Sequence, residues 1–245
     1  MRYTMKKLFT IFFIILSVNN LNSQIDIVHP PNWWIGFENQ ELQILVKGEK
    51  ISNYDVSIDY PGINLKKIHK ADSPNYLFID LNISNKTKPG TFKIKFKNEN
   101  GDLIHYYKLD NKRVLKKQNN GFDSSDVVYL ITPDRFANGD YSNDIVTGLK
   151  EDKINRDDNY ARHGGDLKGI TKNMEYINEM GFTALWLNPI LINDMKEGSY
   201  HGYATTDYYT IDPRFGTLSD YLDFSERAKK NNIKLIKDII VNHCG

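Results

Sequence analysis

Residues 167–187 have the sequence LKGITKNMEYINEMGFTALWL, and this stretch decides the fold of the second half of the chain. Its apolar residues recur first at the spacing of one helix face, namely Leu167, Ile170, Met174, Ile177 and Met180. Gly181 is well placed to end that helix, because glycine readily adopts the left-handed conformation found there. An apolar run, Phe182–Leu187, follows at once and is closed by Pro189. The stretch therefore predicts a helix that leads directly into a buried strand.

The sequence on both sides repeats this alternation of strand and helix. A short apolar run over 127–131 precedes it, and a helix over about 218–231 with Thr217 as its N-cap follows. A third apolar run, over 233–241, comes next. Strands that alternate with helices pair in parallel through right-handed crossovers. Residues 126–245 are therefore predicted to form about three β/α units, the first part of a TIM (β/α)8 barrel.

The chain ends at Gly245, directly after the third predicted strand. An open parallel sheet of three strands would leave its edges and one face uncovered. A complete β/α barrel needs about 250 residues. We therefore expect the sequence to be truncated, with further barrel strands beyond Gly245.

Residues 24–117 show a different pattern, in which apolar and polar residues alternate with a period of two. The alternating runs span residues 41–48, 54–60, 77–83, 92–97 and 103–109. Turn signals such as Pro61-Gly62 and Pro89-Gly90 separate them. Short strands with one solvated face predict an antiparallel β-sandwich of the size of an immunoglobulin-like module. The polar residues 118–125 are predicted to form a linker to the barrel segment.

Residues 1–23 have the layout of a secretory signal peptide. Arg2, Lys6 and Lys7 precede an apolar run from Leu8 to Val18, which is shorter than the roughly 20 residues that span a bilayer. We expect a bacterial protein exported to the periplasm or the extracellular space, without a membrane partner after the signal is cleaved. An uncleaved anchor is the alternative.

The composition sets further limits. A hydrophobic fraction of 40% and a charged fraction of 26% suit a soluble globular protein. The net charge of +1 gives no reason to expect a nucleic acid as partner. The single cysteine, Cys244, cannot form an internal disulfide. An exported protein without disulfides needs another source of stability, such as a large core or a bound metal.

Residues 133–144, with the sequence PDRFANGDYSND, place several side-chain oxygens in one tight loop. Calcium takes six to eight hard oxygen ligands, and loops of this kind supply them. A second segment, His163-Gly164-Gly165-Asp166, could add a carboxylate and a backbone carbonyl from the next loop. An Asn/Asp/Gly turn without a metal explains the same composition, so both interpretations stay open at this point.

Two further polar segments fall at the ends of the second and third predicted strands, where a β/α barrel builds its functional site. Tyr200-His201-Gly202-Tyr203 offers an aromatic ring that could stack on the apolar C–H face of a sugar. Asp238-Ile239-Ile240-Val241-Asn242-His243 offers a histidine that could donate to a substrate hydroxyl. The alternatives are a tyrosine packed at the barrel rim and a purely structural histidine.

Together these segments resemble the α-amylase superfamily, glycoside hydrolase family 13, and are most similar to its neopullulanase and cyclomaltodextrinase branch. Asp238-x-x-x-Asn242-His243 resembles the family's first short sequence region, and residues 200–203 resemble its substrate-stacking loop. Residues 133–140 with 164–166 resemble the calcium loop of the branch. Residues 30–36, PPNWWIG, are similar to the start of the N-terminal module of bacterial members. The resemblance covers nearly the whole chain after the predicted signal peptide.

The resemblance implies roles for individual residues. Tyr203 would stack on the glucose at the cleavage subsite, and His243 would hydrogen-bond that sugar. His201 would support this contact, and Asp238 would orient the site. The implied calcium ligands are Asn138, Asp140, Asn143, Asp144, Gly164 and Asp166.

It also implies an enzyme: a hydrolase of α-glucans, namely starch, maltooligosaccharides, cyclodextrins or pullulan. Retaining hydrolysis needs a carboxylate nucleophile and a carboxylic acid about 5 Å apart. In this family they follow strands four and five, so we expect no catalytic residue in this chain and no activity of the chain alone. One alternative is a glucan-binding module or a homodimer interface on the sandwich, unless Trp33 and Trp34 simply pack that module. Another is a glucanotransferase of the same superfamily.

Overall fold

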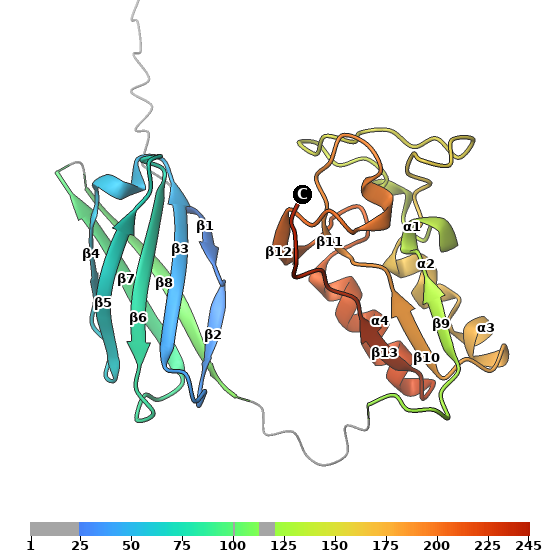
Figure 1. Ribbon diagram of the computed structural model, residues 1–245, viewed down its shortest axis with the longest axis horizontal. Helices are drawn as coiled ribbons and strands as arrows, with labels where there is room; N and C mark the ends of the chain where they lie inside the picture. The colour runs from blue at the N-terminus through green and yellow to red at the C-terminus, as the bar shows by residue number, and fades with distance from the viewer. Residues whose placement is uncertain (1–24, 100, 113–120) are drawn as a thin grey trace, which may run out of the picture. The chain divides into compact units, whose positions relative to one another are not determined.

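The computed structural model describes residues 25–99, 101–112 and 121–245, and the chain divides into two compact units after Lys112 (Figure 1). The predicted signal peptide lies outside the described residues, as does part of the predicted linker. Within these ranges, the helices are all too short or too polar to cross a membrane.

The first unit is a sandwich of two four-stranded sheets, as the alternating pattern predicts. One sheet has the strand order β1-β3-β6-β5 and the other β2-β8-β7-β4. The inward-facing residues of both sheets form one core, in which Ile44, Ile79, Ile94 and Phe96 are fully buried. The elements are β1 Ile25–His29, β2 Asn32–Ile35, β3 Glu41–Gly48, the 3-10 helix η1 Ile51–Asn53, β4 Asp55–Ile58, β5 Ile63–Lys70, β6 Tyr76–Ile83, β7 Gly90–Asn98 and β8 Gly101–Asn111.

The sandwich departs from the antiparallel prediction at one edge, where β2 and β8 run parallel. β1 pairs with β3 in one sheet, and β2 joins the other. The chain changes sheets at Pro30-Pro31, because prolines lack the N–H that a strand ladder requires. Trp33 packs against the core, whereas Trp34 is 39% exposed.

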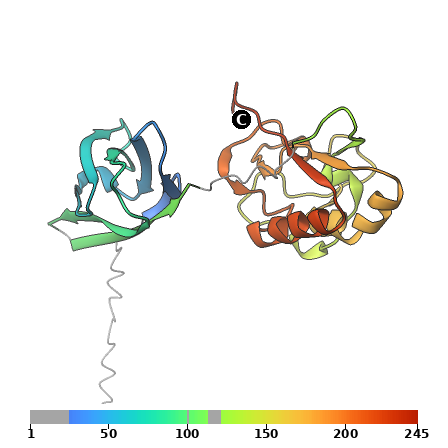
Figure 2. The same ribbon diagram turned by 90° about the horizontal axis from the view of Figure 1, so that it is seen from below.

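The second unit is built on three parallel strands in the order β13-β10-β9, so the first part of a β/α barrel is confirmed. Figure 2 shows the longest helix, α4, lying along one face of this sheet. Leu185 and Leu187 of β10 pack there against Phe224 of α4 and Ile170 of α2. The elements are β9 Val128–Ile131, α1 Pro133–Phe136, η2 Tyr141–Asn143, α2 Leu167–Lys172, α3 Met174–Glu179, β10 Ala184–Leu187, β11 Leu191–Ile192, η3 Ser199–His201, β12 Asp207–Ile211, α4 Leu218–Lys230 and β13 Lys234–Lys237.

The single helix predicted from Leu167 to Met180 is wrong, because the structure has two short helices, α2 and α3, that meet at Asn173. Asn173 leaves the helical conformation, with φ −100° and ψ 16°, and its side-chain amide donates to Gly169 O at 2.7 Å. Asparagine competes in this way with the helix backbone for hydrogen bonds. Thr217 does cap α4, in a reciprocal capping box with Asp220.

Candidate functional site

The parallel pairing brings the C-terminal ends of three strands to one edge of the sheet. Leu187 of β10 lies opposite Ile131 of β9 and Lys237 of β13. Asp238 is the first residue after β13, and η3 lies in the long connection after β10. The loops that carry the predicted sugar-binding residues therefore start side by side.

The structure brings the four predicted substrate-binding residues together at this edge. The Tyr203 hydroxyl donates to Asp238 Oδ2 at 3.0 Å. The rings of His201 and Tyr203 are stacked, with centroids 5.8 Å apart and an interplanar angle of 25°. His243 Nε2 lies 2.9 Å from the carbonyl oxygen of Tyr203. Tyr203 is thus the centre to which Asp238, His201 and His243 are each joined.

The hydrogen bonds also set the protons on the two histidines. The backbone N–H of Tyr203 donates to His201 Nδ1 at 2.9 Å, so a neutral His201 carries its proton on Nε2. Burial lowers the pKa of His201 below its ordinary value of 6.5, against an opposing effect of Glu151. A carbonyl oxygen only accepts, so His243 Nε2 donates to Tyr203 and a neutral ring leaves Nδ1 as an acceptor. In their neutral forms the two histidines thus leave one free donor, His201 Nε2, and one free acceptor, His243 Nδ1.

Asp238 holds a second aromatic residue that the sequence pattern did not single out. Trp186 of β10 donates from Nε1 to Asp238 Oδ2 at 3.1 Å, the same oxygen that Tyr203 uses. Burial, and then the hydrogen bond and charge of Asp238, raise the pKa of Tyr203 above 10.0. Tyr208 received no role from the sequence, and its hydroxyl donates to the carbonyl oxygen of His243 at 2.7 Å. The alternation of the strand was the available signal for Trp186, since it faces away from buried Leu185 and Leu187.

The two segments of the predicted calcium loop are joined by buried Asp134 of α1. Its two carboxylate oxygens accept from the backbone N–H of His163 at 2.8 Å and of Gly164 at 3.2 Å. Gly164 has φ +85°, and a Cβ there would lie 2.8 Å from Asp144 Oδ1 and 2.9 Å from Asn138 Nδ2. Only glycine fits this position, and its backbone approaches both side chains closely.

The oxygens around Gly164 suit a calcium ion. Asn138 Nδ2 donates to Asp144 Oδ1 at 2.6 Å, which leaves Asn138 Oδ1 facing inwards. The side-chain oxygens of Asn138 and Asn143 are buried and have no hydrogen-bond partner within the described residues. A buried acceptor without a partner costs roughly 1–3 kcal/mol, and a cation would remove that cost.

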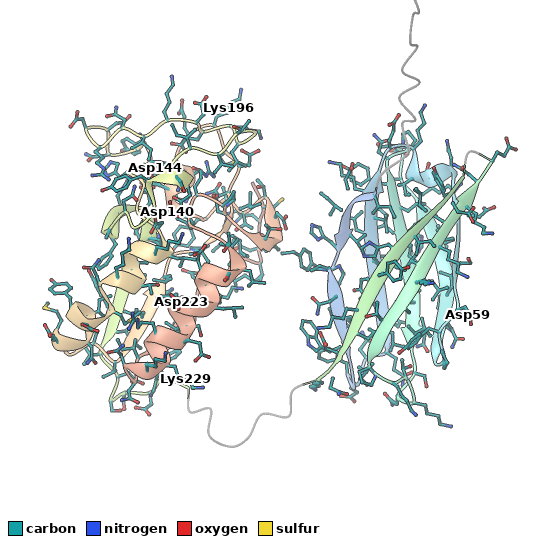
Figure 3. The ribbon with its side chains drawn as sticks, turned by 180° about the vertical axis from the view of Figure 1, so that it is seen from behind. Asp59, Asp140, Asp144, Lys196, Asp223 and Lys229 are labelled. Carbon is teal, nitrogen blue, oxygen red and sulfur yellow. The ribbon has the colours of Figure 1, made fainter. Side chains whose placement is uncertain are left out.

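The carboxylates of Asp140 and Asp166 have other contacts as well. Asp166 caps α2 and accepts from the backbone N–H groups of Gly139, Asp140 and Gly169. Hydrogen bonds from Lys168, and next from Ser142, hold the pKa of Asp140 well below its usual value of 3.8. Figure 3 shows Asp140 and Asp144 close together at the loop end of the unit, far from Lys229 at the end of α4. Among the described residues, no group of three His, Cys, Asp or Glu side chains could hold a metal, so amide and backbone oxygens would be essential to this site.

The chain joins a β-sandwich to parallel β/α units that carry a tyrosine and two histidines at the strand ends, which is the architecture of the first part of a β/α-barrel protein. Two family models match successive parts of the chain: the cyclomaltodextrinase N-terminal domain over residues 27–113 and the α-amylase catalytic domain over residues 130–245. The chain belongs to the α-amylase superfamily.

Three characterised relatives agree with this assignment. The chain is 36% identical over 159 residues to a cyclomaltodextrinase of Thermoanaerobacter pseudethanolicus, a match that covers 65% of the chain and 26% of the relative. It is 41% identical over 119 residues to neopullulanase 2 of Thermoactinomyces vulgaris, covering 49% of the chain and 20% of the relative. It is 32% identical over 129 residues to the periplasmic α-amylase of Escherichia coli, covering 48% and 19%. The chain thus corresponds to about a quarter or less of each relative.

Proposed function

We propose that this chain forms the sugar-binding front part of an exported α-glucan hydrolase that acts on maltooligosaccharides, cyclodextrins, starch or pullulan. The observation that supports the proposal is the convergence of Tyr203, His201, His243 and Asp238 at the C-terminal edge of the parallel sheet. The similarity to a periplasmic amylase and the signal-like residues 1–23 support export.

In this proposal the residues of the chain bind and orient the sugar. The ring of Tyr203 stacks on the apolar face of a glucose unit, while the hydrogen bond to Asp238 fixes the plane of the ring. His201 Nε2 donates to one sugar hydroxyl and His243 Nδ1 accepts from another. The two carboxylates of the retaining reaction, which must lie about 5 Å apart, are assigned to a part of the protein outside residues 1–245.

Replacement of Tyr203 by alanine tests the proposal. We expect the affinity of the full chain for maltopentaose, measured by calorimetry, to fall about tenfold, since tenfold corresponds to 1.4 kcal/mol of lost contact. Tyr203→Phe keeps the ring and loses only the hydrogen bond to Asp238, so its affinity should fall less than threefold.

Tyr176→Ala is the matched control, because Tyr176 is 54% exposed on α3, away from the strand ends. This variant should bind maltopentaose as the unsubstituted chain does. Equal losses in Tyr203→Ala and Tyr176→Ala would contradict the assignment of Tyr203. Absence of any binding by the unsubstituted chain at millimolar maltopentaose would contradict the proposed role of the whole site.

We further propose that a calcium ion binds between two segments: the one that contains α1 and η2, and the one that directly precedes α2. The proposed ligands are Asn138, Asn143, Asp144 and the backbone of Gly164. Asp140 and Asp166, which the sequence also suggests, are paired with Lys168 and with backbone N–H groups, and their carboxylates do not gather with Asp144 as a group of three within the described residues. The proposal is supported by the buried amide oxygens of Asn138 and Asn143, which have no partner within the described residues, and by the close approach of Gly164 to Asp144 Oδ1 and to the amide group of Asn138. The ion would tie the loop after β9 to the start of α2.

Calcium is expected to raise the melting temperature of the second unit. A ligand at a hundred times its dissociation constant stabilises the folded state by about 2.7 kcal/mol, which corresponds to roughly 5–15 °C for a unit of this size. Asn143→Ala should abolish most of this shift, because it removes a ligand oxygen. Asn178→Ala, on an exposed turn of α3, should keep the full shift. Calorimetric scans with calcium and with a chelator measure the difference, and equal melting temperatures in both would argue against the site.

A further inference from the structure

Beneath the Tyr-His-Gly-Tyr segment lies a serine whose polar groups are all held by other side chains. Ser199 is fully buried at the start of η3. Its N–H donates to Glu151 Oε2 at 2.8 Å, and its carbonyl oxygen accepts from Asn193 Nδ2 at 3.3 Å. Its hydroxyl oxygen accepts from Arg162 Nη1 at 3.3 Å. Three separate stretches of chain therefore converge on this one residue.

The side chains that hold Ser199 are themselves buried and fixed. Arg214, with no exposed surface, donates to the carbonyl oxygens of Glu151 at 3.2 Å and of Asn193 at 2.9 Å. The guanidinium of Arg162 lies 4.8 Å from the centre of the Phe215 ring. Arg214 thus fixes the backbone of Glu151 and Asn193, which are two of the three residues that hold Ser199.

Arg162 is buried at a high cost in solvation, yet it forms few hydrogen bonds. Burial, and next the charge of Arg214, lower the pKa of Arg162 against the opposing charges of Asp134, Asp212 and Glu151. Its Nε and Nη2 have no hydrogen-bond partner in the described part of the chain, and Nη2 lies 3.6 Å from Asp134 Oδ1. The bond to Ser199 is therefore the one hydrogen bond of this guanidinium within that part. Removing a partner of a buried charge is strongly destabilising, because it leaves the charge uncompensated.

Ser199 begins the turn that sets the direction of the sugar-binding rings. Arg135 of α1 lies 3.9 Å from the centre of the Tyr200 ring. Asn188 Nδ2 donates to the carbonyl oxygen of His201 at 3.3 Å, and Tyr203 N donates back to His201 Nδ1. The distance along the chain from Ser199 to Tyr203 is only four residues, and Gly202 between them has φ +79°. Any rotation at Ser199 would therefore change the stacking of His201 on Tyr203.

We propose that Glu151, Arg162 and Asn193 are positioning residues that clamp Ser199 and so hold Tyr203 and His201 in the stacked geometry that binds sugar. Their role in sugar affinity rests on the proposed function, whereas their role in holding the turn does not. Glu151 and Arg162 both come from the long loop between η2 and α2, which makes no hydrogen bond to Tyr203 within the described part of the chain. That loop thus acts on the sugar site through Ser199.

Two readouts on the full chain test the clamp: hydrogen exchange of the Tyr203 amide and the affinity for maltopentaose. Ser199→Ala removes the hydroxyl that Arg162 binds, and we expect Tyr203 exchange to become at least tenfold faster and affinity about tenfold weaker. Glu151→Ala should do the same. Glu151→Gln keeps an oxygen that accepts from Ser199 N–H, so both quantities should stay within threefold.

The control is Thr217→Ala, which removes the N-cap of α4 and destabilises the same unit by about 1 kcal/mol without touching Ser199. It should leave the affinity unchanged and speed Tyr203 exchange by no more than about fivefold, the factor that 1 kcal/mol of lost stability gives. Unchanged Tyr203 exchange in Ser199→Ala and Glu151→Ala would overturn the clamp. If Ser199→Ala unfolds the unit, the comparison of Glu151→Ala with Glu151→Gln decides whether the clamp holds Tyr203. An unsubstituted chain that does not bind maltopentaose would remove the proposed function, while the exchange rates still decide whether the clamp exists.

Discussion

Replacing Arg214 by methionine is expected to lower the free energy of unfolding of the second unit by about 3–5 kcal/mol. Arg214 and Asp212 are both fully buried and form a two-pronged pair, with Nε to Oδ1 at 2.9 Å and Nη2 to Oδ2 at 2.7 Å. Methionine would fill much of the volume but leave the Asp212 carboxylate buried without its counter-charge. It would also leave the carbonyl oxygens of Glu151 and Asn193 without a donor.

Arg227→Met is the matched control for this substitution. Arg227 is exposed in the last turn of α4, so its loss should cost less than about 1 kcal/mol, chiefly through the helix dipole. Native-state hydrogen exchange in peptides from residues 205–237 separates the unfolding of this unit from that of the sandwich. A cost below 1 kcal/mol for Arg214→Met would show that the buried pair is not a main source of stability here.

Periodicity was sufficient to predict the two architectures of the chain. The alternation over residues 41–48 and 92–97 gave strands that match β3 and most of β7, because one face of each is buried in the sandwich. The errors arose where side-chain hydrogen bonds or prolines override apolar spacing. Asn173 interrupts a helix whose apolar pattern is continuous. At Pro30-Pro31 the chain leaves the sheet of β1, and β2 pairs in the other sheet. Spacing carries no information on either effect.

The candidate site could be predicted only as far as its local motifs reach. Residues 200–203 and 238–243 each have a composition that suggests chemistry, and the parallel strands bring them together. Glu151, Arg162 and Asn193 have no such signal, because they are single residues in three stretches that meet only in the folded chain. Trp186 has only the signal of strand alternation, and its hydrogen bond to Asp238, 52 positions away in sequence, is visible only in the fold. A sequence pattern finds the loops of this site, and the fold is needed to find what holds them.

Gly202→Ala is expected to destabilise the second unit by roughly 2–5 kcal/mol and to weaken maltopentaose binding at least tenfold. Gly202 has φ +79°, a conformation that costs alanine about 1–2 kcal/mol. A Cβ there would lie 1.9 Å from the carbonyl oxygen of Pro189 and 2.8 Å from its carbonyl carbon. Both atoms are backbone, so no side-chain rotation can relieve the clash. The turn must move, and Tyr203 moves with it.

Gly181→Ala separates the cost of the backbone conformation from the cost of the clash with Pro189. Gly181 has φ +85°, almost the same backbone conformation, but an added Cβ would meet nothing within 4 Å. This variant therefore incurs only the conformational cost of about 1–2 kcal/mol, and it lies at the end of α3, far in sequence from the sugar-binding turn. Thermal unfolding and calorimetric titration of both variants give the comparison. If Gly202→Ala and Gly181→Ala lose the same stability and both keep their affinity, then the close contact of Gly202 with Pro189 does not fix Tyr203. If only Gly202→Ala loses affinity, the position of the ring depends on the space that this glycine leaves open.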